Sequence, residues 1–131
     1  MEMTVTFPGG ARVDASYGNH IVRTDQRLAD GGEDSAPTPF SLFLVSLGTC
    51  AGIYVLEFLR KRNLPTDNVK LIQQTRRDPE SGMLGRVEIE IMLPPDFPEK
   101  YREAIVRAAE LCSVAKLLQK PPAILVSARV G

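Results

Sequence analysis

One long apolar stretch, residues 40–56, sets the strongest limit on the fold of this chain. No residue in it is charged, and several of its side chains are small (Ser46, Gly48, Thr49, Ala51 and Gly52). Thr38 followed by Pro39 is a typical helix start, since threonine caps the first turn and proline suits the first helical position. Cations return only at the far end, where they suit a helix C-terminus. We therefore predict a central helix from Pro39 to about Arg62, buried on most of its circumference.

The same stretch approaches the length of about 20 apolar residues that crosses a membrane. Its small and hydroxylated residues make it less apolar than a typical span, and the sequence contains no second span and no secretory pattern at its start. We interpret it as the core helix of a cytoplasmic protein that does not enter a membrane.

Composition narrows the class of protein further. The 131 residues fit a single domain, residues 1–131, and 16 basic residues balance 16 acidic ones, which argues against a nucleic-acid partner. Two cysteines and one histidine are too few for a structural zinc site or a disulfide scaffold. We expect no metal and no organic cofactor.

Alternation and turn residues predict the other elements. The expected strands are residues 4–7, 12–17, 20–24, 69–75, 84–93 and 124–130, and a second long helix covers residues 98–119. An alternative splits that helix at Cys112-Ser113. The order describes an α+β protein with a mostly antiparallel sheet packed on two long helices. One small sheet cannot cover the whole central helix, so we predict a homodimer that buries the remaining apolar face.

The two cysteines lie on the two predicted helices, Cys50 in the middle of the first and Cys112 on the apolar stripe of the second. Each alone reads as a packing residue, because free cysteine is often buried. Their setting is more specific: a Gly-Gly loop, Thr38-Pro39 after Pro37, the apolar helix that reaches Cys50, and later Cys112-Ser113-Val114. Over nearly its full length, this chain resembles the OsmC/Ohr family.

The resemblance implies an intertwined homodimer in which the two thiols meet near the subunit interface. It implies that Cys50 attacks a hydroperoxide, becomes a sulfenic acid, and is resolved by Cys112 as a disulfide. A reactive thiol needs a nearby cation or donor, because an ordinary thiol is only a few per cent ionised at neutral pH. The resemblance assigns this role to an arginine of the N-terminal hairpin, for which Arg12 is the candidate. The alternative is that Arg12 is an ordinary solvent-exposed strand residue with no role at the thiol.

The sequence departs from the family at the start of the central helix. Phe40 and Ser41 stand where relatives carry the acid that orients the arginine. Glu33, Asp34 and Glu57 are the possible substitutes.

The function we predict is the reduction of organic or hydrogen peroxides in oxidative-stress defence, with an external dithiol as reductant. Apolar residues at the helix start (Phe40, Phe43 and Leu47) favour an alkyl or lipid hydroperoxide. The alternative is a catalytically weak dimer that binds a small hydrophobic ligand and keeps its cysteines for packing. The sequence identifies neither the peroxide nor the reductant.

Overall fold

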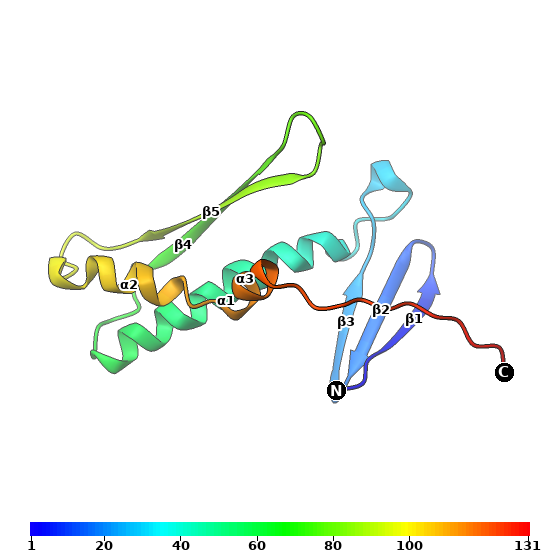
Figure 1. Cartoon of the computed structure of the whole chain (residues 1–131), viewed down its shortest axis with the longest axis horizontal. Coiled ribbons are helices and arrows are strands. Elements are labelled where there is room, and N and C mark those ends of the chain that lie inside the picture. The colour runs from blue at the N-terminus through cyan, green and yellow to red at the C-terminus, as the bar shows by residue number, and fades with distance from the viewer. The chain divides into compact units, whose positions relative to one another are not determined.

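The first three strands form an antiparallel meander, as predicted (Figure 1). The computed structural model describes all 131 residues, with β1 at Thr4–Gly9, β2 at Arg12–Tyr17 and β3 at His20–Thr24. In this sheet Ala15 of the middle strand lies opposite Val5 on one side and Val22 on the other. The meander and the loop after it belong to the first of two units of the chain, Met1–Val45; the second unit is Ser46–Gly131.

The polar loop after β3 is built on one buried carboxylate, that of Asp25, which is 1% exposed. It accepts hydrogen bonds from the backbone N–H groups of Gln26 (2.7 Å), Glu33 (3.3 Å) and Ser35 (3.0 Å), and from the Ser35 hydroxyl. These bonds hold the pKa of Asp25 at about 2, with the Ser35 hydroxyl as the largest cause. Gly32 is required here, because a Cβ at this position would lie 2.1 Å from the carbonyl oxygen of Gln26.

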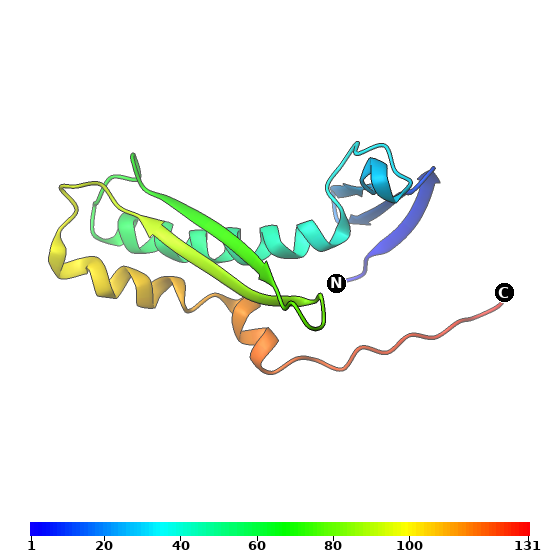
Figure 2. The ribbon, with the colours of Figure 1, turned by 90° about the horizontal axis from the view of Figure 1, so that it is seen from above.

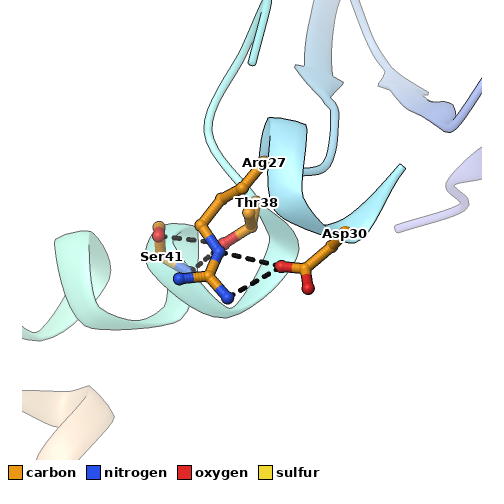
Figure 3. Close-up of polar contacts among 4 residues, drawn as sticks. All are labelled: Arg27, Asp30, Thr38 and Ser41. Carbon is orange, nitrogen blue, oxygen red and sulfur yellow. Dashed lines mark hydrogen bonds and ion pairs between the residues drawn. The ribbon is translucent and has the colours of Figure 1, made fainter. Parts of the chain in front are cut away.

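The central helix α1 spans Pro39–Lys61, close to its predicted bounds. Thr38 caps it: its hydroxyl oxygen accepts the Ser41 N–H at 3.2 Å, as Figure 3 shows. The same view shows the exposed ion pair between Arg27 and Asp30, at 2.8 Å, in the preceding loop, which includes the short 3-10 helix η1 (Leu28–Asp30).

The prediction that α1 is buried on most of its circumference is wrong for the single chain. One stripe of the helix is buried (Leu47, Ala51, Val55, Phe58 and Leu59), while Val45 and Ile53 are about half exposed. By length and composition α1 is the one helix that could cross a membrane, and 28% of the apolar window in it is buried. Core helices of water-soluble proteins meet the same criteria, so the buried stripe is the more informative feature.

The second unit holds the main hydrophobic core. Strands β4 (Lys70–Arg77) and β5 (Leu84–Met92) pair as an antiparallel hairpin, and β5 alternates between half-buried and exposed residues as predicted. The helix α2, Arg102–Ala109, follows the 3-10 helix η2, Glu99–Tyr101, and runs alongside the C-terminal half of α1 in the opposite direction (Figures 1 and 2). The core residues are Val55, Phe58 and Leu59 of α1 and Ile105 of α2, with partly buried residues of both strands packed around them.

Two expectations for the C-terminal part need correction. The second long helix is divided into α2 and a separate helix, α3 (Ser113–Gln119), so the alternative split at Cys112-Ser113 is correct. The strand predicted at residues 124–130 is absent, and this segment is fully exposed. Its alternation is typical of a strand, but a strand needs a partner edge, and no strand of this chain pairs with it.

Candidate functional site

Cys50 is presented by the middle of α1, one turn beyond the buried residue Leu47. Because Thr38 and Pro39 fix the start of the helix and Leu47 and Ala51 fix its buried stripe, Cys50 falls at the margin of that stripe and is half-buried. Close packing by β4 occurs in the same stretch. A Cβ at Gly48 would lie 2.6 Å from the side-chain oxygen of Gln73, so glycine allows that approach.

Cys112 lies at the break between α2 and α3. Its backbone is extended rather than helical (φ −44°, ψ 119°), and its carbonyl accepts the first helical bond of α3, from Lys116 at 3.1 Å. Cys112 is therefore the N-cap residue of α3. Its side chain is 3% exposed, and its sulfur lies 3.9 Å from the carbonyl oxygen of Leu47, toward which the thiol donates.

The break in the helix brings a third side chain to the site, Ser113. Its hydroxyl oxygen lies 3.5 Å from the sulfur of Cys50, and either atom can be the donor. Sixty-three positions separate these two residues in the sequence, so a tertiary contact between the start of α3 and the middle of α1 joins them.

These contacts lower the pKa of Cys50 from 9.0 to about 7. The largest cause is the hydroxyl of Ser113, followed by the backbone N–H of Val114; the thiol of Cys112 and the N–H of Ser113 add smaller contributions, while desolvation by burial acts in the opposite direction. Donors that point at a sulfur stabilise its thiolate, so Cys50 is ionised at neutral pH to a larger extent than an ordinary cysteine. The two predicted cysteines are thus brought together, and one of them has the lower pKa that a nucleophile needs.

Arg12 is the first residue of β2, directly after the β1–β2 turn, in the first unit. Its Nε donates to the carbonyl oxygen of Gly9 at 3.2 Å, and its side chain is exposed. Its assignment to Cys50 stays a prediction. Glu33, a proposed substitute for the missing acid, lies in the loop around Asp25, to whose carboxylate its N–H donates.

Ser113 and Val114 are the site residues that the sequence reasoning missed. The expected activating groups were Arg12 on the N-terminal hairpin and the acidic residues before and within α1. The available signal was the helix break itself: a residue that begins a helix has a free N–H, and Ser113 directly follows the second cysteine.

An apolar groove of about 610 Å³ lies on the Cys112 side of the second unit. Aliphatic residues of β5, α1 and α2 line it together with Cys112, and so do four charged residues, Glu88, Glu90, Arg102 and Glu110. No group of three or more metal-ligating side chains comes together anywhere in the chain.

Comparison with known proteins gives matches of family and of fold. Residues 32–127 match a family described as OsmC-like protein. No curated protein matches the sequence.

Several solved structures share the fold. An OsmC-like protein from Mycoplasma pneumoniae has a TM-score of 0.69 at 13% identity, covering 92% of this chain and 87% of its own. An organic hydroperoxide resistance protein OsmC from Legionella pneumophila has a TM-score of 0.55 at 16% identity, over 90% of this chain and 88% of its own. The organic hydroperoxide resistance protein OhrB of Bacillus subtilis has a TM-score of 0.54 at 17% identity, over 92% and 90%. These matches confirm the predicted α+β architecture.

Proposed function

The chain belongs to the OsmC-like protein family, and from this premise we propose that it is a thiol peroxidase that reduces organic hydroperoxides. The observation that carries the proposal is the pairing of Cys50, whose pKa is lowered to about 7, with the buried thiol of Cys112. The Ser113 hydroxyl, 3.5 Å from the Cys50 sulfur, is a polar partner that a packing cysteine does not need. A role in peroxide stress also agrees with the names of the structural relatives from Legionella pneumophila and Bacillus subtilis.

The proposed reaction has three balanced steps. The Cys50 thiolate attacks the distal oxygen of ROOH, the O–O bond breaks, and the alkoxide takes a proton to leave as ROH, which yields a sulfenic acid on Cys50. The Cys112 sulfur then attacks the Cys50 sulfur; the S–S bond forms, the S–O bond breaks, and the proton of the Cys112 thiol goes to the departing hydroxyl, which leaves as water. An external dithiol reduces this disulfide by exchange and is itself oxidised, which returns both thiols.

The position of Cys112 suits the second step. Burial protects this thiol from direct oxidation, and its contribution to the lowered pKa of Cys50 supports a place close to that sulfur. A sulfenic acid that forms there meets a thiol before a second peroxide reaches it.

Several parts of the proposal extend beyond the Cys50–Cys112 pair. We propose that the protein is cytoplasmic, that residues 1–131 act as one domain within a homodimer, and that Arg12 assists Cys50 in that assembly. The substrate class is an alkyl or lipid hydroperoxide, which the apolar residues of α1 and of the groove favour; Leu47 belongs to both.

The experiment counts thiols. Reduced protein is mixed with one equivalent of cumene hydroperoxide, and in parallel with hydrogen peroxide, before thiol titration and intact-mass measurement. We expect rapid loss of two thiols and two mass units, with cumene hydroperoxide the faster substrate. The Cys112→Ser variant should instead gain about 16 or 32 mass units at Cys50, from one or two added oxygen atoms. The Cys50→Ser variant should keep the thiol of Cys112.

A second candidate function follows from the apolar groove: a dimer that binds a small hydrophobic molecule and uses its cysteines for packing. The groove volume of about 610 Å³ lies within the range of small-molecule sites. Two thiols that survive peroxide in the folded protein would exclude the peroxidase and leave this candidate.

A further inference from the structure

We propose that Ser113 is a positioning residue for Cys50, whose hydroxyl donates to the sulfur and holds it as an oriented thiolate before peroxide arrives. The inference rests on the proposed function, in which Cys50 is the attacking thiolate. It adds a residue from α3 to the two cysteines and gives the activation of Cys50 to a neutral donor.

The geometry supports this role in two ways. The Ser113 hydroxyl lies 3.5 Å from the Cys50 sulfur, within reach of a hydrogen bond to a sulfur atom. Ser113 is also the first residue of α3, so its backbone is fixed by the helix, and by Cys112 next to it, which is buried against α1. The hydroxyl is therefore held at the sulfur by the start of α3 and by the buried Cys112 next to it.

The surroundings leave Ser113 as the main donor. The first turn of α1 contains no acidic residue that could orient a cation toward the site. The titratable side chain near Cys50 is the thiol of Cys112, whose effect on the pKa of Cys50 is smaller, and the remaining contributions come from backbone N–H groups. Removal of a single hydroxyl should therefore change the ionisation of Cys50 measurably.

The direction of the bond can follow the charge. When Cys50 is neutral, its S–H can donate to the hydroxyl oxygen of Ser113; when the proton leaves to solvent, the hydroxyl rotates and donates to the thiolate. The bond to the charged form is the stronger of the two, so it favours ionisation.

The test measures the pH dependence of Cys50 alkylation by iodoacetamide in the full-length protein, with the modified peptide resolved by mass spectrometry. The wild-type midpoint should lie near pH 7, as the pKa of about 7 requires. In Ser113→Ala we expect a midpoint about one pH unit higher and alkylation about tenfold slower at pH 6, with equal rates at pH 10. Ser113→Thr, which keeps the hydroxyl, should restore the wild-type profile.

Ser81→Ala is the matched control, because it removes a serine hydroxyl that donates to Asp78 at 2.9 Å in the β4–β5 turn. Ser113→Gly serves as a second variant without the hydroxyl if alanine impairs folding. An unchanged midpoint in both hydroxyl-free variants, or an equal shift in Ser81→Ala, would overturn the inference. Cumene hydroperoxide is then applied to the same proteins. A shifted midpoint with no peroxide reaction in any of these proteins would reject the proposed function but support the role of Ser113. Rapid oxidation of the wild type with an unshifted midpoint in the Ser113 variants would support the proposed function but reject the role of Ser113.

Discussion

The buried carboxylate of Asp25 links a single residue to the stability of a whole loop. Its oxygens accept four hydrogen bonds, and an amide in place of the carboxylate could not accept all of them, because one oxygen would become an NH₂ donor. We expect Asp25→Asn to leave at least one N–H of the loop without an acceptor and to weaken the other bonds, because a neutral amide oxygen is a weaker acceptor than a carboxylate. The amides of Glu33 and Ser35 should lose hydrogen-exchange protection in this variant.

The same residue should make the loop sensitive to acid. Because its folded pKa of about 2 lies below the ordinary value of 3.8, the stabilisation is complete above about pH 4 and is lost as the pH falls toward 2. Wild-type protection factors should therefore decline over this window, while those of Asp25→Asn stay low throughout. Asp30→Asn, which removes an exposed ion pair with Arg27, is the control and should have little effect. Equal protection in wild type and Asp25→Asn at pH 6 would contradict the role of the carboxylate.

Residues whose roles depend on local chemistry could be predicted from the sequence, and those that depend on a distant contact could not. Thr38 and Pro39 predicted the start of α1 correctly, and this start puts Cys50 in the middle of the helix. Ser113 belongs to the second group, since its partner lies on another helix. The burial of Asp25 could not be predicted either, because the polar residues around it in the sequence are typical of an exposed loop.

At the level of elements, α2 is the piece that depends most on packing. It has only eight residues, too few to be helical alone, and Ile105 is its one buried residue, with 0% exposure. We expect Ile105→Ala to cost about 2–5 kcal/mol of unfolding free energy, and Ile105→Val about 0.5–1.5 kcal/mol, measured by urea denaturation. Val106→Ala on the same helix is the control, since Val106 is half exposed and should lose much less. Similar losses for the two alanine variants would mean that α2 is not held by its buried side.

The division of the second predicted helix into α2 and α3 could not be predicted from the spacing of apolar residues alone. Apolar residues recur at helical spacing through Cys112 and beyond, so the pattern alone favours one helix. The break depends on the extended backbone of Cys112, which places its side chain against α1. This tertiary contact overrides a local preference, and the same contact assembles the candidate site.

At the scale of the whole molecule, the apolar surface of the single chain is incompletely covered. Half-exposed residues on α1 (Phe40, Val45 and Ile53) and on α3 (Leu117 and Leu118) remain in contact with water. The strand predicted at residues 124–130 failed for the same reason: the sequence encodes strand alternation, but no edge in this chain receives it. The homodimer that would cover this surface stays a prediction.

The predicted homodimer gives the last test, because it should cover these surfaces. We expect light scattering to give twice the 14.4 kDa mass of one chain. If residues 124–130 pair with a strand of the second copy, Val126→Pro should weaken the dimer, since proline removes a ladder N–H and is poorly tolerated within a strand. Ser127→Ala, which keeps the backbone N–H, should leave the mass unchanged. A wild-type mass of one chain would reject the dimer, whereas a dimer that resists Val126→Pro would place its interface on the exposed face of α1 instead.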